Sequence, residues 1–365
     1  MALEFLYSQP VKIRFGCGSR HALGEVLSSL GAQRCLVVCD RFLRPAVERM
    51  QHKIPAIAAI FSDVEENPQL IGVTASVGLI REHDVQAVVG IGGGSTMDTA
   101  KFAAAIASES DDPLPYFRGE RPFPAVRLPM IAMPTTAGTG SEVTQVSVMS
   151  NGKEKKTINN PVFMPAVAIV DPELTLTVPP RTTMNTGLDA MAHALEGYWS
   201  RNHQPVSDLC AIEAVRLVLE NLETAYRDGS NLAARENMSL AALLGGLSFA
   251  LPKTAGSHAC SYPLSEDYHL PHGEACAFTL DSFVRINADE RLERLCRRVG
   301  LSGTEELAAR IKALKQLGGL RMTLSDLGEV DLDQLARDAA AHPLMRNNPV
   351  EMDEAACRRM FAALQ

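Results

Sequence analysis

Four side chains of this 365-residue sequence could together bind a divalent metal ion. Asp189 and His193 are four residues apart, so a helix would place a carboxylate and an imidazole on one face. His258 and His272 lie in segments of small, uncharged residues, which favours ligands over solvent-exposed histidines. One carboxylate and three imidazoles suit Fe²⁺, Zn²⁺, Co²⁺ or Mn²⁺. The alternatives are an ordinary surface Asp–His pair, and His269 in place of His272.

Two loops have the composition of a nucleotide-binding crevice. Gly92 to Thr96 follow an apolar run and precede a helical pattern that begins near Met97. Glycines let the backbone approach a phosphate, and the N–H groups at a helix start attract an anion. Residues 134–144, rich in Thr, Ser and Gly, follow the apolar run 130–133 and could donate hydroxyls to a diphosphate or ribose. Taken singly, each could be an ordinary turn, but together they predict a nucleotide site.

Asp40 follows the apolar run 36–39 directly. A carboxylate there can accept both ribose hydroxyls of an adenosine, which favours NAD(H) over NADP(H). A turn or helix N-cap is the alternative role for Asp40. Arg41 and Arg44 could instead bind a 2′-phosphate, which would favour NADP(H).

The elements that must position these residues change character along the chain. In the first part, apolar strands alternate with helices, which predicts a parallel sheet covered on both faces. The expected strands are residues 34–39, 56–61, 85–91, 130–133 and 167–170, with extra strands at 4–7 and 11–15. The expected helices are 46–52, 71–82, 97–107, 187–199, 206–225, 233–249, 289–299, 304–316, 332–340 and 353–364. We therefore predict a Rossmann-like domain of residues 1–179 and an all-helical domain of residues 180–365, with the active site in the cleft between them.

The composition excludes several other classes of protein. A net charge of −8 argues against a nucleic-acid-binding surface. The eight cysteines form no C-x-x-C pair, which indicates free thiols and a cytoplasmic location. No apolar run reaches the roughly 18 residues that a membrane span needs. The extra strands near the start could pair between subunits, so we expect a homodimer.

Taken together, the motifs resemble the iron-containing (group III) alcohol dehydrogenases. The resemblance is carried by Gly92-Gly93-Gly94-Ser95 with Asp98 and Lys101, Pro134-Thr135-Thr136-Ala137-Gly138-Thr139-Gly140-Ser141-Glu142, Gly187-Leu188-Asp189 with His193, and Pro271-His272-Gly273. It implies one divalent metal, Fe²⁺ or Zn²⁺, held by Asp189, His193, His258 and His272. It also implies that the dinucleotide is faced by Asn67, Gly93, Gly94, Ser95, Thr135, Thr136 and Lys155. We include Asp40, Gly92, Asp98, Thr139 and Ser141 in this predicted cofactor site.

The surroundings of His258 bear on the substrate. Many family members have a second histidine four residues after the third metal ligand, where this chain has Tyr262, so Tyr262 becomes a candidate for proton transfer. Lys253, five residues before His258, could bind an anionic group on the substrate, with Arg346 as a second cation. Alternatively, Lys253 is a solvated residue at a helix start.

The segment around Lys253 and Tyr262 is similar to the phosphonoacetaldehyde reductase branch of the family. Our first hypothesis is the NAD(P)H-linked reduction of phosphonoacetaldehyde to 2-hydroxyethylphosphonate. The alternatives are a substrate of the sulfoacetaldehyde, lactaldehyde, 1,3-propanediol or maleylacetate type. A dehydroquinate-synthase-like lyase or a non-catalytic dinucleotide-binding protein would be a different class.

Overall fold

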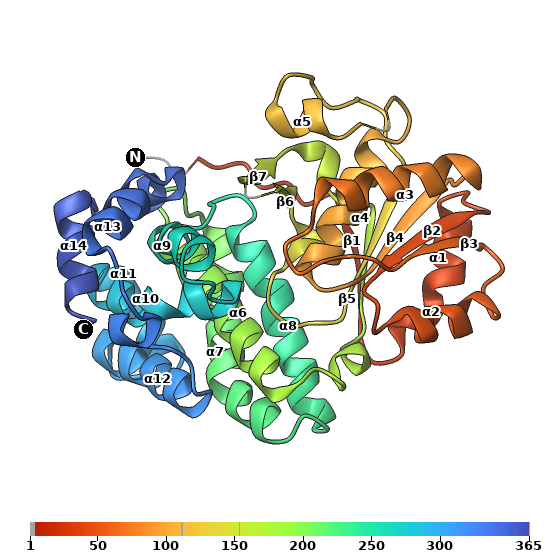
Figure 1. The fold of residues 1–365 in the computed structure, drawn as a ribbon. Helices are drawn as coiled ribbons and strands as arrows, with labels where there is room; N and C mark the ends of the chain where they lie inside the picture. The colour runs from red at the N-terminus through yellow and green to blue at the C-terminus, as the bar shows by residue number, and fades with distance from the viewer. Residues whose placement is uncertain (1–3, 111, 153, 365) are drawn as a thin grey trace. The chain divides into compact units, whose positions relative to one another are not determined.

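The chain forms two compact units in a computed structural model that describes residues 4–110, 112–152 and 154–364. The α/β unit comprises Ser8–Thr136 and Ser141–Thr175. The helical unit comprises Ala137–Gly140 and Leu176 onward, together with the described residues before Ser8. Figure 1 shows strands in the red to yellow part of the chain and only helices from green to blue. Among the described residues, we find no helix with the length and apolarity that crossing a bilayer requires.

The α/β unit is built on one parallel sheet of six strands in the order β1-β8-β5-β4-β2-β3 (Figure 1). The strands are β1 (Lys12–Phe15), β2 (Cys35–Cys39), β3 (Ile57–Phe61), β4 (Ala87–Gly92), β5 (Met130–Pro134) and β8 (Val167–Val170). Successive residues of a strand face opposite sides of a sheet, so Val88 and Val89 contribute to different apolar clusters. Because both faces are covered, β2 and β4 are buried along their whole length, which explains their continuous apolar sequence.

Five helices belong to this unit. They are α1 (Leu23–Ser29), α2 (Arg44–Gln51), α3 (Leu70–Glu82), α4 (Gly94–Ile106) and α5 (Leu114–Arg118). Residues of α1 and α2 pack on one face of the sheet, and residues of α3, α4 and α5 pack on the other. Helix α4 is buried from Thr96 to Ile106, so it lies inside the unit with its first turn at the end of β4.

One expectation for the α/β unit is wrong, and one pair of strands was not predicted. The strand expected at residues 4–7 is wrong, because this segment belongs to the helical unit and has no neighbouring strand in the sheet. An antiparallel hairpin of β6 (Val146–Asn151) and β7 (Glu154–Asn159) was not predicted, because its second strand is polar and largely exposed. Strand β1 pairs with β8 at the edge of the sheet.

The helical unit contains nine helices among the described residues. They are α6 (Pro180–Trp199), α7 (Pro205–Arg227), α8 (Leu232–Phe249), α9 (Gly256–Glu266), α10 (His272–Ile286), α11 (Glu290–Arg298), α12 (Thr304–Leu317), α13 (Leu332–Ala341) and α14 (Glu354–Ala362). Over both units, the described residues form the 3₁₀ turns η1 (Ser19–Ala22), η2 (Ser141–Val143), η3 (Pro161–Phe163), η4 (Pro172–Thr175), η5 (Leu324–Leu327) and η6 (Pro343–Asn347). Helices α9 and α10 were not predicted: α9 starts at a glycine and contains Pro263, which lowers its helix propensity. The predicted fold class, a Rossmann-like α/β domain followed by an all-helical domain, is confirmed.

Candidate metal centre and nucleotide loops

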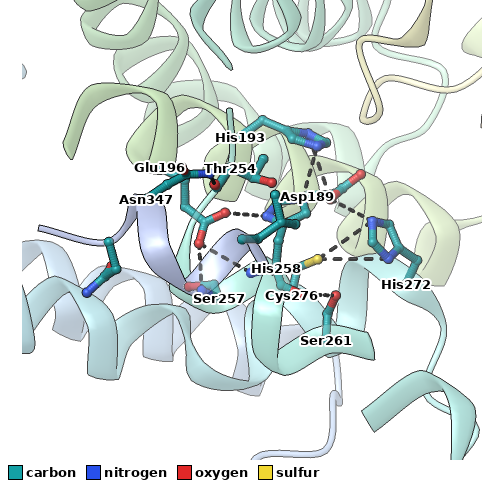
Figure 2. Close-up of polar contacts among 12 residues, drawn as sticks. Asp189, His193, Glu196, Thr254, Ser257, His258, Ser261, His272, Cys276 and Asn347 are labelled. Atoms are coloured by element: carbon teal, nitrogen blue, oxygen red, sulfur yellow. Dashed lines mark hydrogen bonds and ion pairs between the residues drawn. The ribbon is translucent and has the colours of Figure 1, made fainter. Parts of the chain in front are cut away.

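The four predicted metal ligands come together in the helical unit (Figure 2). Asp189 and His193 lie on one face of α6 and are buried, while His258 is the third residue of α9 and His272 the first of α10. The Asp189 Oδ1 atom lies 3.8 Å from His193 Nδ1, 3.7 Å from His258 Nε2 and 3.8 Å from His272 Nε2. Three helices thus supply these side chains, with the Asp189 carboxylate at their centre.

A close approach between α10 and α6 brings His272 to this carboxylate. A Cβ atom on Gly273 would lie only 2.2 Å from the carbonyl oxygen of Asn185 and 3.3 Å from the Cβ of Asp189. Any larger residue would therefore push the start of α10 away from α6. Gly273, which follows His272 in the family-like motif, is required for this packing.

Glu196 orients His258, and the sequence analysis did not identify it. This fully buried carboxylate accepts hydrogen bonds from the backbone N–H groups of Ser257 at 2.6 Å and His258 at 3.2 Å, and it contacts His258 Nδ1. Burial opposes ionisation, but the neighbouring His258 and the backbone donors outweigh it and lower the pKa of Glu196. Its spacing, three residues after His193 and seven after Asp189, was the signal that could have revealed it.

The donor set fits a divalent cation. His193 Nδ1 lies 3.2 Å from the carbonyl oxygen of Gly138, which can only accept, so Nδ1 carries the proton. The Glu196 carboxylate fixes the proton on His258 Nδ1 in the same way. The two Nε2 lone pairs then face each other at 3.0 Å, and the buried Asp189 Oδ1 has no hydrogen-bond partner. A cation is the species that would satisfy all three acceptors at once.

Cys276 adds a sulfur donor to this centre. Its ligand atom and those of Asp189, His258 and His272 all lie within 4.8 Å of one another. We expected His193 in this set; instead it adjoins the group through His258. Cys276 lies one turn after His272 on α10, and this i, i+4 spacing was a signal we did not use. Burial raises the pKa of the Cys276 thiol.

Replacing Glu196 by glutamine should weaken metal binding by roughly 10- to 100-fold, the usual cost of losing a partner that orients a ligand. A glutamine amide can still accept from the backbone, but its NH₂ group would then face the His258 Nδ1–H. Metal affinity measured by competition with a chelator tests this, with Glu236→Gln on α8 as the matched control. An unchanged affinity in Glu196→Gln would show that Glu196 serves only the packing of α9.

The first glycine loop is shorter than expected, because α4 begins at Gly94 and not near Met97. Gly93 is the N-cap in an extended conformation, so Gly94, Ser95 and Thr96 form the first helical turn. A Cβ atom on Gly92 would lie 2.4 Å from Thr96 Oγ1, so the tight turn from β4 requires glycine. The N-terminal N–H groups of a buried helix with no capping side chain at Gly93 suit a phosphate.

Asp98 and Ser141 hold the loops in place. The Ser141 hydroxyl donates to Asp98 Oδ1 at 3.0 Å, and the backbone N–H of Val148 donates to Asp98 Oδ2 at 2.9 Å. The ammonium of Lys101 donates to Ser141 Oγ at 2.7 Å, and all three side chains are buried. Their observed role is therefore to position α4, the 141–143 turn and the β6–β7 hairpin relative to one another.

The other predicted cofactor residues are distributed over both units and make different contacts. Thr135 is buried and its N–H donates to the carbonyl oxygen of Gly92 at 3.0 Å, while Thr136 is half-buried beside it. Lys155 Nζ donates to Asn67 Oδ1 at 3.2 Å, so the structure brings these two residues together. Thr139 lies in the 137–140 segment, which belongs to the helical unit. The Ser95 hydroxyl donates to the carbonyl oxygen of Glu66.

Asp40 and the glycine loop share one edge of the sheet. Strands β2 and β4 pair in parallel, with Cys39 opposite Ile91, so Asp40 and Gly93 both follow the carboxyl ends of neighbouring strands. Chain order reverses between β2 and β4, and ligands of open α/β sheets bind at such a switch point. One Asp40 oxygen, Oδ1, accepts from the N–H of Leu43 at 3.0 Å, as the turn alternative predicted.

Carboxylates already engage the two arginines that could have bound a 2′-phosphate. Arg41 pairs with Asp63 at 2.6 Å, and Arg44 pairs with Glu48 at 2.9 Å. These ion pairs reduce the positive charge available beside Asp40 for a phosphate.

Lys253 and Tyr262 flank His258 along the chain. Lys253 is half-buried between α8 and α9 with φ at +70°, an unusual backbone conformation for a residue with a side chain. Its Nζ donates to the carbonyl oxygen of Ala250 at 3.2 Å. Tyr262 lies one turn after His258 on α9 and stacks on His342, with ring centroids 4.1 Å apart.

Comparison with known protein families gives a consistent result over both units. The profile described as iron-containing alcohol dehydrogenase matches residues 10–172. The profile described as Fe-containing alcohol dehydrogenase family, C-terminal, matches residues 183–364.

Known proteins similar to the chain are alcohol and aldehyde oxidoreductases. The long-chain-alcohol dehydrogenase 1 of Geobacillus thermodenitrificans is 34% identical over 369 residues, covering 95% of this chain and 93% of that protein. The 1,3-propanediol dehydrogenase of Klebsiella pneumoniae is 34% identical over 382 residues, covering 98% of each. The crystal structure of sulfoacetaldehyde reductase from Bifidobacterium kashiwanohense in complex with NAD⁺ superimposes with a TM-score of 0.95 at 40% identity, covering 100% of this chain and 99% of that one.

Proposed function

Because the chain belongs to the iron-containing alcohol dehydrogenase family, we propose that it reduces a small aldehyde carrying a strongly anionic group, with sulfoacetaldehyde as the first candidate. Family membership makes the chain an NAD-linked, metal-dependent alcohol dehydrogenase or aldehyde reductase. The similarity to a sulfoacetaldehyde reductase supports a sulfonate over the phosphonate that we first expected. Phosphonoacetaldehyde becomes the second candidate.

The observation that carries this proposal is a half-buried cation without an anionic partner. Among the described residues, Lys253 Nζ forms no ion pair with a carboxylate; it donates to the neutral carbonyl oxygen of Ala250, and burial lowers the pKa of this lysine. A partly desolvated ammonium gains more from an anionic ligand than a fully hydrated one would. The proposal assigns Lys253 to the anionic group of the substrate.

A second cation lies on a segment that is tied to the Lys253 segment. Asn347 Nδ2 donates to the carbonyl oxygen of Thr254 at 2.8 Å, and Arg201 N donates to Asn347 O at 2.9 Å. These bonds hold η6, and with it the exposed Arg346, against the residues that precede α9. We propose that Arg346 adds long-range attraction for the anionic substrate.

The proposed reaction needs stabilisation of the carbonyl oxygen, correctly oriented metal ligands and a source of the alcohol proton. A divalent metal held by Asp189, His193, His258 and His272 would supply Lewis-acid stabilisation of the carbonyl oxygen during hydride transfer. Glu196 and the Gly138 carbonyl keep two of these imidazoles in the tautomer that presents Nε2. We assign to the Tyr262 hydroxyl a part in delivering the proton that the product alcohol requires.

The cofactor of the proposal is NADH. Asp40 follows β2 at the switch point of the sheet, and its arginine neighbours are paired with carboxylates. The first turn of α4 would receive the diphosphate, and the paired Asn67 and Lys155 would lie beside it. We also retain a homodimer as part of the proposal.

A substrate panel tests the proposal directly. We expect kcat/KM of the Fe²⁺-loaded enzyme with NADH to be about 10- to 100-fold higher for sulfoacetaldehyde than for propanal, the value of one or two charge-assisted hydrogen bonds. Phosphonoacetaldehyde, 3-hydroxypropanal and NADPH complete the panel. Equal kcat/KM for propanal and sulfoacetaldehyde would contradict an anionic substrate, and the absence of net NADH oxidation with every aldehyde would contradict a reductase.

A further inference from the structure

Cys276 lies among the metal-centre side chains, and the proposed function gives it no role. Its side chain is fully buried on α10, and its sulfur points toward the imidazole of His272 (Figure 2). The Sγ atom lies 3.7 Å from His272 Nε2, and it belongs to the group of four ligand atoms that lie within 4.8 Å of one another. Cys276 belongs to the apolar core of the helical unit, but its sulfur also adjoins two imidazoles and a carboxylate.

The separations between these donor atoms match those around one ion. Nitrogen at about 2.1 Å and sulfur at about 2.3 Å from one ion lie about 3.1 Å apart at a right angle and about 3.6 Å apart at a tetrahedral angle. The observed distance between Cys276 Sγ and His272 Nε2 is 3.7 Å, and the distance between Asp189 Oδ1 and His258 Nε2 is also 3.7 Å. The unpartnered Asp189 Oδ1, 2% exposed as a residue, lies in the same group of donor atoms.

Charge balance points in the same direction. A divalent ion in a buried site is costly unless nearby anions neutralise it. The Asp189 carboxylate supplies one negative charge among the donor atoms, whereas the Glu196 carboxylate contacts Nδ1 of the neutral His258 imidazole and so lies one ring away from the ion-binding atoms. A thiolate at Cys276 would supply the second charge among the ligands.

We propose that Cys276 is a thiolate ligand of the metal ion and biases the centre toward ions that bind sulfur well, such as Zn²⁺, Co²⁺ and Fe²⁺, over Mn²⁺. This inference rests on the proposed metal-dependent function. When the ion binds, the S–H bond of Cys276 breaks, its proton passes to solvent, and a metal–sulfur bond forms with no change in oxidation state. Mn²⁺ prefers oxygen ligands and gains less from the sulfur.

Cobalt substitution tests the proposal without relying on activity. The full-length protein loaded with Co²⁺ should show visible d–d bands and, in addition, a near-ultraviolet thiolate-to-cobalt charge-transfer band. Cys276→Ser and Cys276→Ala should retain the d–d bands and lose the charge-transfer band. Cys296→Ala removes another fully buried cysteine, on α11, and should keep both. Circular dichroism of each variant checks that it is folded.

Metal affinity provides the second readout. Chelator competition should show that Cys276→Ser weakens Zn²⁺ and Co²⁺ binding at least tenfold while changing Mn²⁺ binding by less than about threefold, following ligand softness. A wild-type protein with d–d bands but no charge-transfer band overturns the cysteine ligand and leaves the proposed function intact. The same holds if the charge-transfer band persists in Cys276→Ser. The absence of all cobalt bands from the wild type overturns both proposals.

Discussion

Replacing Asp189 by asparagine is expected to abolish metal binding and to lower kcat/KM for aldehyde reduction by at least about 10³-fold, because Lewis-acid stabilisation contributes several kcal/mol to such reactions. Asp189 Oδ1 lies within 3.8 Å of nitrogen atoms on three imidazoles and is buried without a hydrogen-bond partner. An amide of the same size removes the negative charge at the centre of the site. Metal content after dialysis and steady-state rates with NADH measure the effect.

A matched control variant shows whether Asp189→Asn loses activity because it no longer binds the ion or because it no longer folds. Asp267→Asn makes the same chemical change at an exposed residue directly after α9, and it should bind metal and turn over like the wild type. We expect Asp189→Asn to unfold cooperatively, since it preserves the volume that packs against Gly273. If Asp189→Asn kept a full complement of metal, the proposed ligand set would be wrong.

The sheet was predictable because its burial leaves a strong pattern in the sequence. Strand β8 has the predicted bounds, and β2 and β3 differ by one residue at the start, because runs such as Leu36 to Val38 have no polar residue to interrupt them. The β6–β7 hairpin carries no such signal: its second strand is Glu154–Asn159, polar and half-exposed. Strand β6 is held by contacts with Asp98 and Pro68, which are distant in sequence.

The side chains that cluster around Asp189 could be selected from the sequence more readily than the residues that support them. Asp189 and His193 share one helix, so their spacing could be interpreted without any tertiary structure. His258 lies on α9, which begins at Gly256 and contains Pro263 and therefore has low helix propensity, whereas His272 is the first residue of α10, a helix that we did not predict. Cys276 was interpreted as an ordinary buried thiol, because without α10 its one-turn relation to His272 has no meaning.

Glu196 illustrates why supporting residues are harder to find than ligands. A glutamate in a helix is usually exposed, and nothing adjacent to Glu196 in sequence reveals that it is fully buried. Its partners, Ser257 and His258, lie 61 and 62 residues later in the chain. The packing of α6 against α9 brings Glu196 to the N-terminus of α9, where the backbone N–H groups need an acceptor. The same packing brings it to the His258 imidazole, whose Nδ1–H also needs an acceptor. The spacing of Glu196 from Asp189 and His193 indicates a shared helical face, but its burial and its partners follow only from the fold.

Replacing Lys253 by glutamine should change substrate preference more than overall activity. We expect kcat/KM for sulfoacetaldehyde to fall by about 10- to 100-fold, the value of a hydrogen bond to a charged group, and that for propanal to fall by less than about threefold. The selectivity ratio between the two aldehydes is the informative measurement, because a general loss of structure would lower both. Lys312→Gln, at an exposed position on α12, is the matched control and should leave the ratio unchanged.

The pH dependence gives an independent test of the same residue. Burial lowers the pKa of Lys253 from its ordinary value of 10.5, so its positive charge is lost at a lower pH than that of an exposed lysine. In the wild type, KM for sulfoacetaldehyde should therefore rise with pH before 10.5 is reached, while KM for propanal should not follow it. Lys253→Gln should lose this difference between the aldehydes, since a glutamine side chain does not titrate. If the difference persisted in Lys253→Gln, another titrating group would cause it, and the assignment of Lys253 to the sulfonate would be wrong.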